Sequence, residues 1–221
     1  NSPSNPTGVV YRRAELERIA ALCIEHDVVV LSDEIYSRIL FGATHHSIAT
    51  LPGMSERTIV LDGFSKTWSM TGWRLGFSVA PPELTAAFVK LMTNSNSCAV
   101  NFAQHAAIAA LEGPDDCIQE MVQQFTRRRD VLVEGLDALP GVACDPPEGG
   151  CFAFADVRGT GQSEEAVARG LLEEADVACV AGSAFGAGGA GFLRFSLGQD
   201  EARMAEAVTR IGAWLGHSKA P

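Results

Sequence analysis

The sequence predicts an α/β protein in which part of a mostly parallel sheet with flanking helices precedes a smaller α/β unit. Two observations support this prediction. Short apolar runs rich in β-branched residues alternate with segments whose apolar residues recur at helical spacing. Uniformly apolar strands between helices are typical of a parallel sheet that is buried on both faces. A long amphipathic helix then separates this region from a second series of short strands and helices.

The first region is expected to hold three strands and three helices. Leu16, Ile19, Ala20 and Cys23 recur at helical spacing ahead of the first apolar run. Proline suits the first turn of a helix, so Pro81-Pro82 is expected to begin one. The predicted strands cover residues 28–31, 58–62 and 75–80, and the later helices cover about 82–94 and 99–112.

The second region begins with a helix expected over about residues 115–139, which Pro140-Gly141 ends. Short strands and helices follow it, and we place a domain boundary within this helix or at its end. The predicted strands lie near residues 142–145, 151–157, 177–180 and 192–197, and the predicted helices lie near 163–175 and 201–215.

The composition excludes several classes of protein. With 47% hydrophobic and 20% charged residues in 221, the chain has an ordinary globular composition. Its formal net charge of −10 disfavours nucleic acid as a direct partner. No apolar run reaches the ~20 residues that cross a bilayer, so no membrane partner is expected. The cysteines form no CxxC pair, so we expect no metal site and a cytoplasmic location. The chain opens on loop residues without an initiator Met, which suggests a fragment.

Polar residues gather where the predicted strands end. Asp33 follows one strand and Lys66 follows another, and Asn5 stands in a Pro-rich turn at the start of the chain. In an open parallel sheet, ligands bind at the carboxyl ends of the strands. Taken singly, each of these residues is more often a cap or a surface charge, and Asp33 with Lys66 could form a plain ion pair.

Together, these residues and their neighbours form a far more specific series. In order and approximate spacing, it resembles the class I/II aminotransferases of pyridoxal-phosphate (PLP) fold type I, and most closely the bacterial aspartate-aminotransferase-like subgroup. The resemblance covers essentially the whole chain but only the later part of that family's sequence. The motifs are Asn5-Pro6-Thr7-Gly8, Asp33-Glu34-Ile35-Tyr36, Ser65-Lys66-Thr67, Gly72-Trp73-Arg74-Leu75-Gly76 and Arg194-Phe195-Ser196.

The resemblance implies a C-terminal part of a large PLP-binding domain over residues 1–130 and a small C-terminal domain over 131–221. It also implies PLP as the cofactor and Lys66 as the lysine that forms a Schiff base with it and then transfers protons. Asp33 would keep the pyridine nitrogen protonated, because a nearby carboxylate raises the pKa of that nitrogen. Further roles follow for Asn5 and Tyr36 at the ring hydroxyl, and for Arg74 with Ser65 at the phosphate. The family also leads us to expect a cis Asn5–Pro6 peptide.

Arg194 lies within an apolar predicted strand, where an unpaired charge would be costly. The resemblance implies that Arg194, with Asn5, binds the substrate α-carboxylate, and the alternative is an interdomain salt bridge. The Gly-rich stretch 182–189 ahead of it lacks the spacing of a phosphate-binding loop. We expect this stretch to let the backbone pass close to the mouth of the site.

The implied activity is transfer of an amino group between an amino acid and a 2-oxo acid (EC 2.6.1.-) by a homodimer. The Asn- and Ser-rich segment 94–102 is the candidate for reaching the partner subunit. Two alternatives stay open: a PLP-dependent carbon–sulfur lyase, and the effector domain of an aminotransferase-like transcription regulator. The sequence departs from many relatives at Gly63, where they carry a hydroxyl residue, and at Gly150-Cys151-Phe152.

Overall fold

The computed structural model describes residues 1–217, and the chain divides into two compact units. Unit 1 comprises Asn1–Pro3 and Val10–Gln119, and unit 2 comprises Ser4–Val9 and the chain from Glu120 onward. The long helix α4 (Asp116–Asp137) begins in unit 1 and continues into unit 2. Among the helices of residues 1–217, none is long and apolar enough to cross a membrane.

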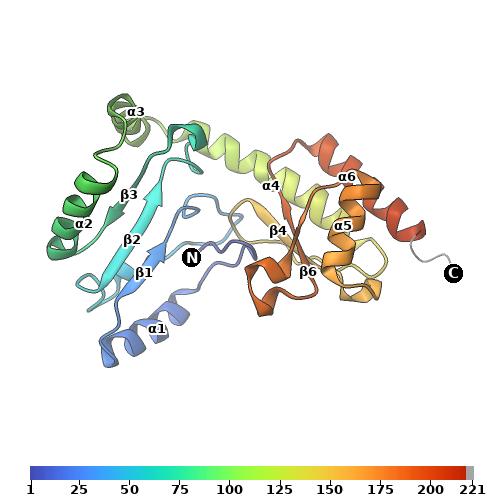
Figure 1. Ribbon diagram of the computed structural model, residues 1–221, viewed down its shortest axis with the longest axis horizontal. Coiled ribbons are helices and arrows are strands. Elements are labelled where there is room, and N and C mark those ends of the chain that lie inside the picture. The colour runs from blue at the N-terminus through green and yellow to red at the C-terminus, as the bar shows by residue number, and fades with distance from the viewer. Residues whose placement is uncertain (218–221) are drawn as a thin grey trace. The chain divides into compact units, whose positions relative to one another are not determined.

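Unit 1 contains a three-stranded sheet in the order β1-β2-β3 (Figure 1). Strand β1 (Val30–Asp33) pairs in parallel with β2 (Thr58–Gly63), so that Asp33 stands opposite Leu61. Strand β3 (Gly76–Val79) pairs with β2 in the antiparallel direction, with Gly63 opposite Gly76. The α/β class is therefore confirmed, whereas the expected parallel direction of the third strand is wrong.

The reason lies in the connection between β2 and β3. A parallel connection needs a crossover, usually an α-helix, but residues 64–75 contain only the short 3-10 helix η2 (Thr71–Trp73). The expectation of strands buried on both faces is also wrong for β3, because all four of its residues are exposed within residues 1–217.

The core of unit 1 forms where helix α1 packs against a short 3-10 segment. Helix α1 (Arg13–Glu25) begins where the Glu15 carboxylate accepts a hydrogen bond from the backbone N–H of Arg12, and η1 covers Ile48–Thr50. Two further helices, α2 (Pro82–Ser95) and α3 (Asn101–Glu112), follow β3 as the sequence predicts. The buried residues of this core are Leu16, Ala20, Cys23, Ile48, Leu51 and Met54.

A buried carboxylate joins the end of β1 to the loop that follows it. The Glu34 carboxylate accepts hydrogen bonds from Ser47 Oγ at 2.6 Å and Ser32 Oγ at 3.0 Å, and lies 2.9 Å from His45 Nε2. Burial alone would raise the pKa of Glu34. The hydrogen bonds from His45 and Ser47, the charge on His45 and the hydrogen bond from Ser32 outweigh burial, so the pKa of Glu34 lies below its usual value.

Unit 2 is built around a second sheet, in the order β4-β6-β5, in which both pairings are antiparallel (Figure 1). The strands are β4 (Phe152–Asp156), β5 (Val180–Ala181) and β6 (Phe192–Ser196). Alternate residues Ala153, Ala155, Leu193 and Phe195 are buried. Helix α5 (Glu164–Ala175) begins at the Ser163 cap and contacts β5, β6 and helix α6 (Glu201–His217).

The predicted strand at 142–145 is reduced to a single bridge between Ala143 and Asp156. Pro146 and Pro147 follow at once, and proline has no N–H with which to continue a ladder. The predicted strand at 177–180 is also shorter than expected, since only Val180–Ala181 pairs.

Small residues set how closely the helices of unit 2 approach one another. A Cβ at Gly135 of α4 would lie 2.7 Å from Val208 of α6, and one at Gly170 of α5 would overlap the Trp214 ring of α6. Since real Cβ atoms do not sit this close to another carbon, these positions exclude any larger side chain without movement of α6.

The Glu34 network predicts a pH-dependent contribution to stability. A lowered pKa means that ionised Glu34 stabilises the folded state above the unfolded pKa of about 4.3, and that this stabilisation is lost as the pH falls through the lower folded value. We expect Glu34→Gln to lower the free energy of unfolding by about 2 kcal/mol at pH 7. The difference from the wild type should narrow below about pH 4 in urea unfolding.

The matched control is Glu17→Gln, because Glu17 pairs with Arg13 on the exposed face of α1. Such a surface pair contributes little, so this change should stay within about 0.5 kcal/mol. An equal loss of unfolding free energy in the two variants would contradict a stabilising role for ionised Glu34. So would a loss in Glu34→Gln that does not shrink in acid.

Candidate active site

Asp33 and the Lys66 loop lie at one edge of the unit 1 sheet. Because β1 and β2 are parallel and Asp33 pairs with Leu61, the residues that follow both strands leave the sheet on the same side. The Asp33 side chain accepts a hydrogen bond from the Ile35 N–H at 3.2 Å. Its backbone carbonyl accepts from the Ser2 N–H and from the Asn1 side chain. The half-buried carboxylate of Asp33 is thus held at the carboxyl end of β1.

Lys66 and Tyr36 meet at this edge. The Lys66 Nζ lies 6.0 Å from the centre of the Tyr36 ring, and Tyr36 is only 5% exposed. Ser65, directly before the lysine, is half-buried. Among residues 1–217, no ion pair joins Lys66 to Asp33, so the plain ion-pair alternative has no support in the structure.

The loop that carries Lys66 is anchored through Trp68. The indole Nε1–H donates a hydrogen bond to the Ala110 carbonyl of α3 at 2.9 Å, and the Phe64 ring lies 5.0 Å from the Trp68 ring. The Arg38 guanidinium sits 5.7 Å from the same ring and pairs with Asp115 at 2.5 Å. These contacts hold both flanks of Lys66 on the body of unit 1.

Arg74 lies at the far end of the same loop, just before β3. It adopts a left-handed backbone conformation with φ 53°, its side chain is exposed, and its Nη1–H donates to the Thr71 carbonyl at 2.8 Å. Gly63 at the near end is close to β3, since a Cβ there would lie 3.0 Å from the Gly76 Cα. This contact gives a packing reason for glycine at position 63.

Carboxylates concentrate at the edge where β1 and β2 end. Burial raises the pKa of Asp62, the charges of Glu34 and Asp33 raise it further, and a hydrogen bond from the Gly63 N–H and the charge on His45 only partly oppose them. The charges of Asp33 and Glu34 therefore act on a third carboxylate close to the end of β2.

Asn5 and Arg194 meet within unit 2. The Arg194 Nη1–H donates a hydrogen bond to Asn5 Oδ1 at 2.9 Å, although the two residues are 189 positions apart. The Arg194 guanidinium carbon also lies 4.1 Å from the centre of the Phe152 ring and 4.7 Å from that of the Phe185 ring. The arginine expected to bind a carboxylate is therefore half-buried and held on several sides.

Backbone contacts attach the segment of Asn5 to unit 2. Gly8, at φ +71°, accepts hydrogen bonds at its carbonyl from the N–H groups of Glu148 and Gly149, and a Cβ on Gly8 would overlap the Pro147 side chain. The predicted cis Asn5–Pro6 peptide is confirmed, and Ser2–Pro3 is cis as well.

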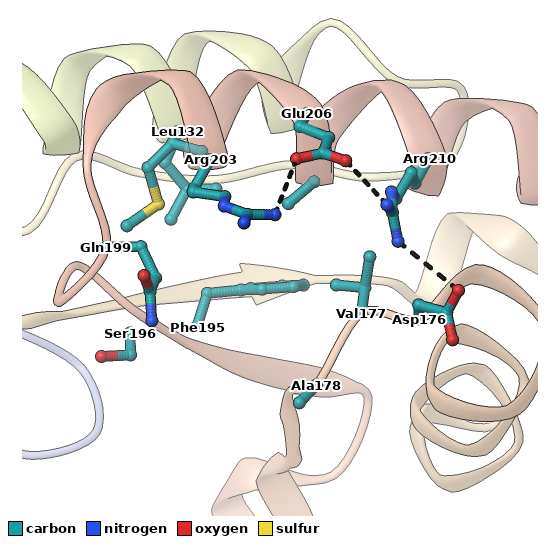
Figure 2. Close-up of a pocket in the computed structure, with 12 residues that line it drawn as sticks. Leu132, Asp176, Val177, Ala178, Phe195, Ser196, Gln199, Arg203, Glu206 and Arg210 are labelled. Atoms are coloured by element: carbon teal, nitrogen blue, oxygen red, sulfur yellow. Dashed lines mark hydrogen bonds and ion pairs between the residues drawn. The ribbon is translucent and has the colours of Figure 1, made fainter.

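A pocket of about 330 Å³ opens elsewhere in unit 2 (Figure 2). Apolar side chains such as Phe195, which alternates with Arg194 along β6, line part of it, and charged side chains of α6 line another part. Glu206 pairs with Arg203 at 3.2 Å and with Arg210 at 2.7 Å, and Arg210 also reaches Asp176 at 3.6 Å. The arginines that line the pocket are thus already paired with carboxylates, and no residue predicted for the active site lines the pocket.

Sequence reasoning missed the two phenylalanines around Arg194. Phe152 had a usable signal, because alternation along two paired strands places it on the same face as Arg194. Phe185 had none, because its position depends on the folding of the Gly-rich stretch 182–189.

Comparison with known proteins agrees with the motifs. Residues 1–211 match the family described as aminotransferase class I and II. The chain is 40% identical to the aspartate aminotransferase of Pyrococcus abyssi, covering 99% of this chain and 57% of that protein. It is 42% identical to the arginine–pyruvate transaminase AruH of Pseudomonas aeruginosa, covering 96% and 54%.

Solved structures give the same result. The aromatic aminotransferase from Pyrococcus horikoshii OT3 superposes with a TM-score of 0.96 at 40% identity, covering 99% of this chain and 59% of that one. The chain thus spans somewhat more than half the length of the relatives it matches. The family predicted from the motifs is confirmed: this chain belongs to the class I and II aminotransferases.

Proposed function

We propose that the protein is a PLP-dependent aminotransferase that moves an amino group between an amino acid and a 2-oxo acid, with Lys66 as the catalytic residue. The observation that carries this proposal is the parallel pairing of β1 with β2, which presents Asp33 and the Lys66 loop at one edge of a sheet. The carboxyl ends of parallel strands are where such ligands bind. Membership of the aminotransferase family supports the same reaction class.

The donor set of unit 1 fits a phosphorylated pyridine aldehyde. Lys66 offers an amine for the aldehyde, the Asp33 carboxylate suits a pyridinium nitrogen, and the buried Tyr36 offers a hydroxyl for the ring oxygen. The Arg74 guanidinium and the Ser65 hydroxyl suit the phosphate, and Arg74 would exchange its bond to the Thr71 carbonyl for that anion. When bound, PLP supplies an electron sink for the substrate α-carbon. We therefore assign Lys66 to proton transfer at that carbon.

Asn5 and Arg194 of unit 2 are proposed to bind the substrate, with Arg194 taking the α-carboxylate and Asn5 orienting the guanidinium. Asn5 is also proposed to bind the cofactor ring hydroxyl together with Tyr36. Named relatives act on aspartate, on aromatic amino acids and on arginine with pyruvate. All of these donors share an α-carboxylate, so this part of the proposal does not depend on which one this protein uses.

We further propose that unit 1 is part of a larger PLP-binding domain, that unit 2 is mainly a small C-terminal domain, and that the protein acts as a homodimer in the cytoplasm. In support of the dimer, Val100 and Phe102 of the segment 94–102 are exposed apolar residues at 53% and 67%. We propose no nucleic-acid, membrane or metal partner.

The first prediction from the proposed function concerns the cofactor. In the full-length protein, Lys66→Ala should abolish the visible absorbance band that appears with PLP, because the amine that binds the aldehyde is gone. Lys90→Ala is the matched control, since Lys90 lies on the exposed surface of α2, and it should keep the band. Loss of the band in both variants, or in neither, would remove Lys66 from its role.

The second prediction separates binding from chemistry at Asp33. Asp33→Ala should retain some cofactor, since Lys66 and Arg74 remain, but lose most of its turnover because the pyridine nitrogen loses its carboxylate partner. Absorbance titration with PLP measures the first effect and the initial rate of oxo-acid formation the second. Near-normal turnover in Asp33→Ala would contradict this assignment.

The third prediction tests the carboxylate site. Removing two charge-assisted hydrogen bonds of about 1.5–3 kcal/mol each should lower kcat/KM for amino acids on the order of a hundredfold or more in Arg194→Ala. Lysine keeps the charge but not the planar fork, so Arg194→Lys should rescue little. Amines without a carboxylate should be nearly unaffected.

The alternative of a structural salt bridge makes the opposite prediction. A broken bridge would lower thermal stability and reduce turnover of carboxylate-bearing and carboxylate-free donors alike. Equal losses for an amino acid and its decarboxylated amine would therefore exclude Arg194 from substrate binding while leaving Lys66 and Asp33 in place.

A further inference from the structure

Two aromatic rings from different elements of unit 2 flank the Arg194 guanidinium. Phe152 belongs to β4 and Phe185 closes the 3-10 helix η4 (Gly182–Phe185). Their ring centres lie 4.1 Å and 4.7 Å from the guanidinium carbon, within the range of favourable cation–π contact. The rings contact the cation without accepting hydrogen bonds from its edge.

The strand register explains the Phe152 contact. Arg194 pairs with Phe154 across β4 and β6, and Phe152 is two residues away along β4. Residues two apart on a strand share a face, so the Phe152 ring can reach Arg194 diagonally. This contact is therefore fixed by the backbone ladder between β4 and β6 rather than by a loop.

The Phe185 contact depends on how the Gly-rich stretch closes. A Cβ on Gly182 would overlap the Gly189 carbonyl oxygen, so the two ends of the stretch touch through their backbones. A second tie comes from Ser183, whose Oγ–H donates to the Glu165 carboxylate of α5 at 3.3 Å. The stretch is thus closed on itself, with the Phe185 ring beside the Arg194 guanidinium and still 39% exposed.

A second arginine, which follows β4 in the short 3-10 helix Arg158–Thr160, provides a comparison. Arg158 lies 5.2 Å from the Phe192 ring, which stacks on Phe154. Its Nε–H donates to the two carboxylate oxygens of Asp156 at 2.9 and 3.0 Å, and its Nη2–H donates to the same carboxylate. Arg194 has two rings, but within residues 1–217 it has no carboxylate partner, and only Asn5 accepts a hydrogen bond from it. A guanidinium carries five N–H donors, so most of its fork is left for an external acceptor.

We propose that Phe152 and Phe185 are positioning residues that fix the plane of the Arg194 guanidinium, so that its unused edge receives the substrate α-carboxylate. This inference rests on the proposed function, since it assigns the external acceptor as an amino-acid carboxylate. Both rings act through Arg194. Because the rings order the Arg194 side chain before the substrate binds, the entropic cost of ordering it is not subtracted from the binding energy. Loss of either ring should therefore weaken amino-acid binding more than it slows turnover of the bound substrate.

The test uses the PLP-loaded full-length protein with Phe152→Leu, Phe185→Leu and Phe185→Tyr. Leucine keeps apolar bulk but removes the ring face, whereas tyrosine keeps the face. Phe192→Leu is the matched control, because it removes a ring beside Arg158 on the same sheet. KM and kcat are measured for L-aspartate and L-phenylalanine. Binding of phenylethylamine, which lacks the carboxylate, is measured through the change in cofactor absorbance.

We expect each leucine variant at 152 and 185 to raise KM for both amino acids about fivefold, with a smaller change in kcat. Phenylethylamine binding should not change. Phe185→Tyr should keep the wild-type KM, and Phe192→Leu should leave KM and kcat unchanged. Because Phe185 is partly exposed, its variants also test the inference if Phe152→Leu fails to fold.

Unchanged KM in Phe185→Leu, an equal loss for phenylethylamine, or the same loss in Phe192→Leu would overturn the inference. Failure of the proposed function is a different result, namely a wild-type protein that transfers no amino group from any amino acid to a 2-oxo acid. If the wild type is active but the variants at Phe152 and Phe185 keep its KM, only the positioning role is refuted.

Discussion

The parallel pairing of β1 with β2 is the constraint on which the candidate site in unit 1 depends. Parallel strands send the residues after them to the same edge, so one register places Asp33 beside the loop of Lys66. A slip of one residue would turn the side chains of β1 to the opposite faces of the sheet. The buried Glu34, joined to His45 and Ser47, ties the end of β1 to the following loop.

The chemistry of unit 2 depends on a different kind of constraint. Ser4–Val9 lies far from the rest of unit 2 in sequence, yet it is bound there by the Gly8 carbonyl and by the bond from Arg194 to Asn5. Arg194 is held in place by neighbours that leave most of its donors unused. Each unit therefore presents a distinct part of the proposed reaction: unit 1 the groups for the cofactor, and unit 2 the groups for the substrate carboxylate.

Local sequence patterns predicted most helices and strands, because apolar periodicity and proline punctuation act over a few residues. Helix α2 begins at Pro82 and α4 ends two residues before the predicted limit at 139. The direction of β3 was predicted wrongly, because strand direction depends on the path of residues 64–75, which apolarity does not encode. The motifs identified Lys66, Asp33 and Arg194 as candidates, but not the rings beside Arg194. Phe185 reaches it only through the backbone contact of Gly182 with Gly189.

The central claim is that the amine at the end of β2 is the one that binds the cofactor. Reduction with borohydride fixes pyridoxal phosphate irreversibly to the lysine that holds it, and peptide mass mapping then identifies that lysine. The lysines of this chain are Lys66, Lys90 and Lys219, so the possible outcomes within it are few. We expect the phosphopyridoxyl mass on the peptide that contains Lys66. The same mass on the Lys90 or Lys219 peptide, with Lys66 unmodified, would contradict the account.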